Sequence, residues 1–240
     1  MLLFAGISET GLVRKNNEDT ICIDESKGLI AVADGIGGHA FGEVASNLAI
    51  DRLREAAENA TSEDSPIDVL KEGFFAANDL IYTQGHKNDK LEGMGTTLTA
   101  ALLTDKNIFL AHIGDCRAYL LTETNLRRLT EDHSLAEELV REGKISQIAV
   151  QTHPQKHILT RSLGQESLIE PDCSQISWKE EDLLLIVSDG FYNHLEESEI
   201  FSAFSTLHFK EALQTLLNLC LQRGGYDNIS AVVAKRQVNK

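Results

Sequence analysis

The chain has 240 residues, 42% of them hydrophobic, which is enough to bury a sizeable core as one domain. Its 22 Lys and Arg residues stand against 37 Asp and Glu residues. The resulting net charge of −15 argues against nucleic acid or an anionic membrane surface as the main partner. No apolar run is long enough to span a bilayer, and residues 1–7 lack the basic start of a signal peptide. We therefore expect a cytoplasmic protein with no membrane insertion.

The predicted elements alternate between apolar runs of strand length and longer amphipathic stretches. Strands are expected at residues 2–8, 21–23, 28–34, 96–103, 108–113, 117–121, 126–129, 183–188 and 229–234. Helices are expected at 42–58, at 67–84, and from residue 209 to the stop at Gly224-Gly225. In the first helix, Val44, Leu48, Leu53 and Ala57 should share one face. Strands that cluster in hairpins, with helices in pairs between them, favour an antiparallel α+β fold.

Residues 131–164 differ in character, since they combine short helical pieces with polar loops. Within them, His153 and His157 have the i, i+4 spacing of a helical metal pair. Pro154 lies between them, so we expect a structural or surface role instead. His112 lies inside an apolar strand, where a packed and hydrogen-bonded histidine is the expected outcome.

The stretch from Leu29 to His39 carries the clearest chemical signal. Its apolar run ends at Asp34, and three glycines within the next four positions then precede His39. Glycines allow positive φ and let backbone atoms approach a small ligand. A carboxylate beside free backbone carbonyls suits a hard cation such as Mg²⁺ or Mn²⁺. Taken alone, however, the stretch is more typical of a strand followed by a glycine-rich turn.

Four aspartates share this placement at the end of an apolar strand or in the turn before one. They are Asp34, Asp115, Asp189 and Asp227. Strand ends meet at the edge of a sheet, so the four carboxylates are expected to share one pocket. Without a cation they would repel one another and raise each other's pKa values. Divalent cations reverse that effect, so the set indicates a metal site, although a single such Asp is most often a turn former or helix cap.

Six short motifs occur in one order along the chain. They are Arg14-x-x-Asn17-Glu18-Asp19, Val32-Ala33-Asp34-Gly35-Ile36-Gly37-Gly38-His39, Gly95-Thr96-Thr97, Gly114-Asp115-x-Arg117, Ser188-Asp189-Gly190 and Gly225-x-Asp227-Asn228. In this order they resemble the bacterial branch of the metal-dependent protein phosphatase 2C family, over essentially the whole chain. The resemblance implies a single catalytic domain over residues 1–240, with a flap at about 131–164. It implies two stacked antiparallel β-sheets flanked by pairs of α-helices, with the metal site at one end.

The resemblance also implies a reaction, a metal and partners. The chain would hydrolyse phosphoserine and phosphothreonine with Mn²⁺ or Mg²⁺, by direct attack of a metal-bridging hydroxide. Two ions would occupy the core site, and a third would bind more weakly. Phosphorylated proteins would be the substrates, a Ser/Thr kinase the counterpart, and the chain would act as a monomer. As a hypothesis, the flap governs which phosphopeptides fit.

Site residues carry over from the family pattern by position. Asp34 would bridge two metals, and Gly35 would offer its carbonyl to one of them. Asp189 and Asp227 would complete the first metal, and Asp115 with Asp189 would hold the third ion. The remaining roles fall to Glu18 and Asp19, through metal-bound waters, to Arg14, which would bind the phosphate, and to His39 as general acid.

Two alternatives remain open at this point. The first is a metal-dependent hydrolase of small phosphoesters. The second is an inactive relative that binds phosphoproteins as a regulator. The second is disfavoured because Arg14, Asp34, Asp189 and Asp227 are all present, whereas a degenerate site would have lost some of them.

Overall fold

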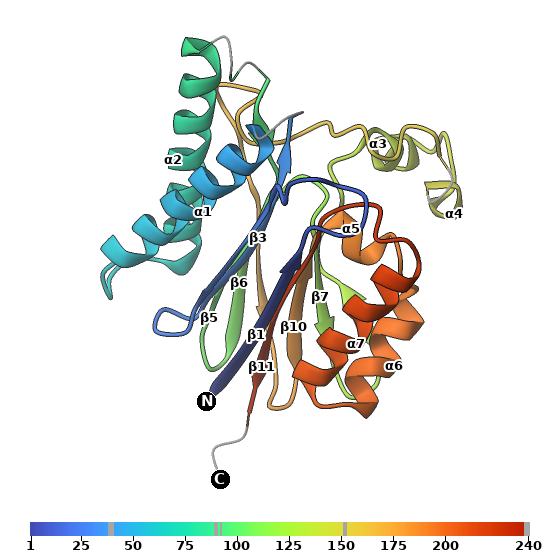
Figure 1. Cartoon of the computed structure of the whole chain (residues 1–240). Coiled ribbons are helices and arrows are strands. Elements are labelled where there is room, and N and C mark those ends of the chain that lie inside the picture. The colour runs from blue at the N-terminus through green and yellow to red at the C-terminus, as the bar shows by residue number, and fades with distance from the viewer. Residues whose placement is uncertain (38–40, 89–90, 92, 151–152, 238–240) are drawn as a thin grey trace.

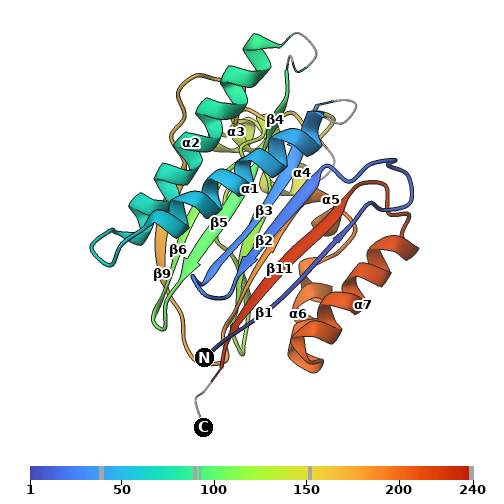
Figure 2. The same ribbon diagram turned by 60° about the vertical axis from the view of Figure 1, so that its left-hand side comes forward.

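The framework of the protein is a pair of antiparallel sheets packed face to face (Figure 1). The structure, a computed structural model, describes residues 1–37, 41–88, 91, 93–150 and 153–237. Each sheet is covered on its outer side by helices, as Figure 2 shows from a second direction. The predicted α+β arrangement of two stacked antiparallel sheets flanked by pairs of helices is confirmed.

The two sheets draw their strands from distant parts of the chain. In spatial order, the first sheet contains β1 (Leu2–Glu9), β11 (Ile229–Arg236), β10 (Leu183–Val187), β7 (Arg117–Leu121) and β8 (Leu126–Arg128). The second contains β2 (Asp19–Asp24), β3 (Leu29–Ile36), β5 (Leu98–Leu103), β6 (Asn107–Ile113) and β9 (Asp172–Ser177), with β4 (Gly95–Thr96) paired to the end of β3. Because the first sheet joins β1 to β11, residues from both ends of the chain reach the same edge of the molecule.

The helices form two pairs and a set of short pieces. Helices α1 (Phe41–Asn59) and α2 (Pro66–Lys87) cover the second sheet, and α6 (Glu197–Thr206) and α7 (Phe209–Gln222) cover the first. The short helices are α3 (Leu135–Arg141), α4 (Gln147–Val150) and α5 (Asp189–Tyr192). The flap region predicted at 131–164 contains α3 and α4, which project from the sandwich on the side of β7 (Figure 1).

Strand β10 shows how the sequence produces the layers. Successive strand residues point to opposite faces of a sheet. Leu184 and Ile186 therefore enter the layer between the sheets, whereas Leu183, Leu185 and Val187 pack beneath α5, α6 and α7. Both faces are covered, which explains why the run is apolar at every position.

Helix α1 packs through small residues. Its buried face includes Ala45, Ala49 and Leu53, and α2 comes so close that a β-carbon at Gly73 would lie 3.0 Å from the Leu53 Cα. The expectation that Val44 lies on this face is wrong, because its side chain is 38% exposed. The close contact between helices selects alanine and glycine over larger apolar residues.

Two other features differ from the sequence-based expectations. The strand predicted at 96–103 is broken at Thr97, where β4 ends and β5 begins. Strand β9 and helix α6 were not predicted at all. β9 is an edge strand in which four of six residues are exposed and none is fully buried, so it lacks an apolar run. Among the described residues, no helix is long and apolar enough to cross a membrane.

Candidate metal centre

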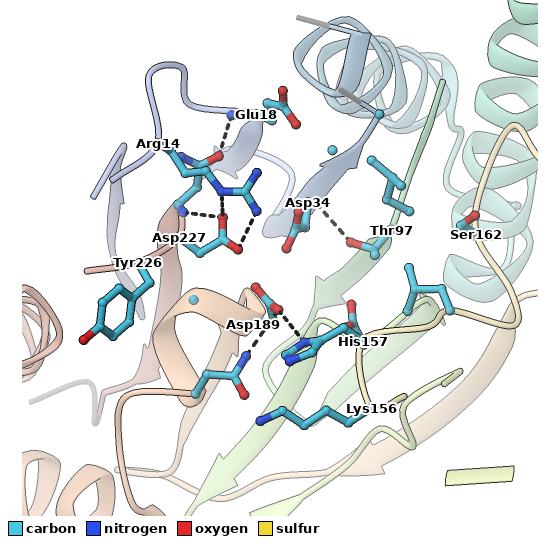
Figure 3. A pocket seen from close by; sticks show the side chains of 18 of the residues that line it. Arg14, Glu18, Asp34, Thr97, Lys156, His157, Ser162, Asp189, Tyr226 and Asp227 are labelled. Carbon is cyan, nitrogen blue, oxygen red and sulfur yellow. Dashed lines mark hydrogen bonds and ion pairs between the residues drawn. The ribbon is translucent and has the colours of Figure 1, made fainter. Parts of the chain in front are cut away.

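A cavity of about 1080 Å³ opens at the end of the sandwich where β3 ends and β11 begins. Figure 3 shows carboxylates from three separate segments, Asp34, Asp189 and Asp227, directed into the same space. Glu18 and Asp115 also line this cavity. The four aspartates that the sequence predicted to share a pocket therefore do lie around one cavity.

Asp34 is held in place by the sheet on both sides. Strand β2 places Asp19 directly opposite Asp34. The Asp34 backbone N–H donates to the Thr97 hydroxyl at 3.0 Å, and the Thr97 N–H donates to the Asp34 carbonyl at 2.9 Å. The break in the strand at Thr97 thus serves to fix Asp34, and β3 continues to Ile36 instead of turning at the aspartate as expected.

Gly35 sits at a crowded point of the backbone. A β-carbon there would lie 2.3 Å from backbone atoms of Gly42 and 2.6 Å from the Glu18 carbonyl oxygen. Its N–H donates to that carbonyl at 3.1 Å. No side chain fits between the end of β3 and the start of α1, which explains the glycine in physical terms.

Asp115 lies in the turn between β6 and β7. Gly114 before it has φ +109°, a conformation that favours glycine, and its N–H donates to Nδ1 of His133 at 3.0 Å. The His133 backbone N–H in turn donates to the Gly114 carbonyl at 2.7 Å. Tyr192 adds a third contact, because its hydroxyl donates to the Asp115 carbonyl at 3.2 Å.

Asp189 and Asp227 are brought together by a glycine. Asp189 is the first residue of α5, directly after β10, and Asp227 precedes β11. A β-carbon at Gly190 would lie only 2.0 Å from the Asn228 carbonyl oxygen. The absence of a side chain at Gly190 therefore lets α5 approach the start of β11 and brings the two aspartates to one wall of the cavity.

The electrostatics of this cluster are those of a site built for cations. Burial, and then repulsion from Asp19, Asp189 and the other carboxylates, raises the pKa of Asp34 well above its usual range. The pKa of Asp115 is raised for the same two reasons, and burial raises the pKa of Asp19 to about 7. One oxygen of Asp19, Oδ1, is buried without a hydrogen-bond partner. Such a set is stable when a divalent cation neutralises it.

The arrangement of the acids also limits how ions would bind. In the described part of the chain, no three acidic, His or Cys side chains converge closely enough to hold one ion by themselves. The carboxylates instead ring the cavity. Mg²⁺ is usually bound by one or two carboxylates and retains several waters, so a ring of acids with the Gly35 carbonyl beside it fits this kind of ion.

Arg14 faces the acids from the loop between β1 and β2. Its Nε lies 2.8 Å from Asp227 Oδ1, and its Nη2 donates to Oδ2 at 2.9 Å, so the contact is bidentate (Figure 3). The hydrogen bond to Asp227 is the main cause that raises the Arg14 pKa. The predicted phosphate-binding residue therefore lies beside a predicted metal ligand. The predicted general acid, His39, lies outside the described residues.

Sequence reasoning missed the residues that the flap contributes. Lys156 and His157 both line the cavity, and His157 Nδ1 lies 3.8 Å from Asp189 Oδ2. His157 is thus on the surface, as expected, but it faces the acids. The i, i+4 spacing to His153 gave no indication of this, since the His153 ring accepts from the Gln155 N–H and does not share a site with His157.

The buried histidine of β6 behaves as predicted. His112 Nδ1 lies 2.8 Å from the Thr99 hydroxyl, and its Nε2 lies 3.0 Å from the Glu131 carbonyl. It packs against His133, with ring centroids 4.8 Å apart. His133, which sequence reasoning did not assign to the site, holds the Gly114-Asp115 turn through its two hydrogen bonds with Gly114. The prediction that His112 is a packed, hydrogen-bonded residue is confirmed.

Comparison with known proteins agrees with this geometry. The family model described as protein phosphatase 2C matches residues 6–229. The serine/threonine phosphatase stp of Listeria welshimeri is 35% identical over 238 residues, covering 96% of this chain and 94% of that protein. PstP of Mycobacterium tuberculosis is 38% identical over 235 residues, covering 98% of this chain and 45% of that longer protein.

Solved structures show the same fold. The crystal structure of the M. tuberculosis serine/threonine phosphatase PstP/Ppp has a TM-score of 0.92 at 37% identity and covers 99% of each chain. The catalytic domain of PstP in complex with two manganese ions has a TM-score of 0.87 at 36% identity, covering 98% of this chain and 97% of that one. By its sequence, its fold and its ring of carboxylates, the chain belongs to the protein phosphatase 2C family of metal-dependent serine/threonine phosphatases.

Proposed function

We propose that the chain removes phosphate from phosphoserine and phosphothreonine residues of proteins, in the cavity ringed by Asp34, Asp115, Asp189 and Asp227. The observation that carries this proposal is the buried, mutually repelling set of carboxylates with the Arg14 guanidinium directly beside it. Carboxylates alone would repel a phosphate. Divalent cations on them, together with Arg14, would turn the same cavity into an anion site.

The residues divide into ligands and substrate contacts. Asp34, the Gly35 carbonyl, Asp189 and Asp227 would hold two core ions, and Asp115 with Asp189 would hold a third, weaker one. Bound Mn²⁺ or Mg²⁺ would supply an acidified water as the nucleophile and neutralise charge on the phosphoryl oxygens. Glu18 and Asp19 would act on these ions through water.

The remaining contacts serve the phosphoryl group and the leaving oxygen. Arg14 would bind two phosphoryl oxygens through the planar fork that it now presents to Asp227. Water would displace the serine or threonine oxygen at phosphorus, giving inorganic phosphate and the free hydroxyl. The proton on the leaving oxygen would come from His39, which follows β3 in the sequence.

The same proposal covers the substrates, the partners and the location of the protein. The substrates would be phosphorylated proteins, with a Ser/Thr kinase as the counterpart, and we expect a cytoplasmic monomer with one domain over residues 1–240. The flap at 131–164 would help select the substrate, since its residues Lys156 and His157 line the cavity. The retention of Arg14, Asp34, Asp189 and Asp227 around one cavity supports an active enzyme over a regulator without activity.

The test compares hydrolysis of p-nitrophenyl phosphate and of a phosphothreonine peptide with Mn²⁺, with Mg²⁺ and with chelator. Both activities should require metal, and Asp189→Ala should lower kcat by on the order of 10²–10³-fold through lost electrostatic stabilisation. Asp105→Ala, in the exposed turn between β5 and β6, is a matched control that should retain activity. Near wild-type activity of Asp189→Ala at saturating Mn²⁺ would refute the site assignment. Hydrolysis of p-nitrophenyl phosphate with no hydrolysis of the phosphothreonine peptide would favour a small-phosphoester hydrolase.

A further inference from the structure

A second cavity, of about 470 Å³, lies next to the metal centre and is called the side cavity below. The cavity of the metal centre is called the catalytic cavity below. The side cavity and the catalytic cavity share three lining residues, Leu159, Ser162 and Gln165. Ser162 lies at the margin of the catalytic cavity opposite Tyr226 (Figure 3). The side cavity therefore adjoins the catalytic cavity on the side where the flap rejoins the sandwich.

Four of the ten residues that line the side cavity are apolar, and one of these is largely exposed. Ile113, Leu159, Leu168 and Ile169 line it, and the Leu168 side chain is 84% exposed. Of its three charged residues, Glu166, Arg161 and Glu170, the last two have charged partners. Arg161 donates to Asp172 at 2.8 Å, and Glu170 pairs with Lys71 at 2.7 Å. Leu168 is therefore the main apolar contact that the side cavity offers, and an exposed leucine beside a cavity is suited to an apolar side chain.

The wall between the two cavities is fixed by the backbone. Residues 159 and 163 each form an isolated β-bridge, Leu159 with Ser134 and Leu163 with Thr96. Between them, the Thr160 N–H donates to the His133 carbonyl at 2.8 Å. The wall is therefore ordered before a ligand binds, and binding does not lose conformational entropy by ordering it.

We propose that the side cavity is a subsite for an apolar side chain of the substrate polypeptide, near the phosphorylated residue. This rests on the proposed function, in which the phosphorylated residue sits in the catalytic cavity. The polypeptide must continue on both sides of that residue. A third cavity, of about 450 Å³, shares Lys156, His157 and Asn193 with the catalytic cavity, so the substrate polypeptide has space in that direction too. A small phosphoester would end before it reached the side cavity.

The experiment uses a set of phosphothreonine peptides in which one leucine is moved through the positions flanking the phosphothreonine, with glycine as the reference. At one position the wild-type enzyme should prefer leucine about tenfold in kcat/KM. That preference corresponds to about 1.4 kcal/mol, part of the value of burying a leucine side chain. Leu168→Asp should reduce the leucine-to-glycine ratio toward one, because the apolar wall becomes charged.

The chain offers a matched control for this variant. Ile148 in α4 is 85% exposed, as Leu168 is, but it is not among the residues that line these three cavities. Ile148→Asp introduces the same charge on the flap and should keep the wild-type ratio. The leucine and glycine peptides with the wild type and Leu168→Asp form a double-mutant cycle, whose coupling energy measures how position 168 interacts with the leucine, the introduced charge included.

Several results would overturn the proposal. These are the absence of a leucine preference at every position, an unchanged ratio in Leu168→Asp, or an equal loss of the ratio in Ile148→Asp. Any of them would remove the subsite while leaving the phosphatase activity in place. Hydrolysis of p-nitrophenyl phosphate without hydrolysis of any phosphopeptide would refute the proposed function and the subsite with it.

Discussion

Replacing Asp19 with asparagine should stabilise the metal-free protein, and the gain should depend on pH. Asp19 lies opposite Asp34 at the start of β2, with 7% of its surface exposed. Its Oδ2 accepts from the Ser188 hydroxyl at 2.8 Å, but its Oδ1 has no partner. An asparagine keeps a carbonyl oxygen for Ser188 and cannot become charged, so the variant removes one repelling carboxylate from the cluster.

The size of the effect follows from the pKa of Asp19. Burial raises this pKa from 3.8 to about 7, and at 1.36 kcal/mol per unit the shift corresponds to about 4 kcal/mol. Between these two values the folded protein binds more protons than the unfolded chain, so the free energy of unfolding falls as pH rises. The loss in the free energy of unfolding that the Asp19 carboxylate causes is absent below pH 3.8 and complete above about pH 7. Asp19→Asn should therefore equal the wild type near pH 4 and exceed it by up to about 4 kcal/mol at pH 8.

Urea unfolding in chelator, followed by the fluorescence of the single tryptophan, Trp178, measures this difference. Saturating Mn²⁺ should cancel it, because a bound cation neutralises the carboxylates of the wild type. Asp24→Asn, at the other end of β2, is the matched control. Hydrogen bonds from Ser26 lower the Asp24 pKa, so its pH dependence should have the opposite sign. A constant difference between Asp19→Asn and the wild type from pH 4 to pH 8 would refute the reasoning.

Two further predictions concern Arg14 and His112. Arg14→Ala should lower kcat/KM by roughly 10- to 100-fold, the value of a charge-assisted hydrogen bond, and Arg14→Lys should recover only part of this because it lacks the planar fork. Equal activity of Arg14→Lys and wild type, in steady-state assays with Mn²⁺, would contradict the bidentate role. Burial lowers the His112 pKa from 6.5 to about 3, so the unfolded chain binds the extra proton and acidification should destabilise the fold. From pH 7.5 to pH 5 the wild type should lose about 2 kcal/mol more than His112→Gln, as measured by urea unfolding, and an equal loss would show that His112 does not titrate this way.

The fold was predictable where periodicity was strong. β10 and α7 appear at the predicted positions, because a covered strand and a one-sided helix leave clear patterns in the sequence. β9 left none, since an edge strand that is half exposed needs few apolar residues. The packed face of α1 was misjudged at Val44, because the helix packs through alanines and a pattern of large apolar residues does not reveal them.

The site was predictable to the extent that it is built at strand ends. Asp34, Asp115, Asp189 and Asp227 follow or precede apolar strands, so the pattern alone indicated that they meet. His157 and Lys156 come from the flap, whose path depends on tertiary contacts such as the bridge between residues 134 and 159. No local signal in the sequence reports such a path.

The metal centre straddles the two sheets. Asp34 belongs to β3 in one sheet, while Asp227 precedes β11 and Asp189 follows β10 in the other. The distances between these carboxylates therefore depend on how the two sheets are aligned. Phe4, Ile186 and Val232 fill the layer between the sheets, and truncating any of them would leave a cavity there. We therefore expect catalysis to depend on the packing of residues that do not approach the substrate.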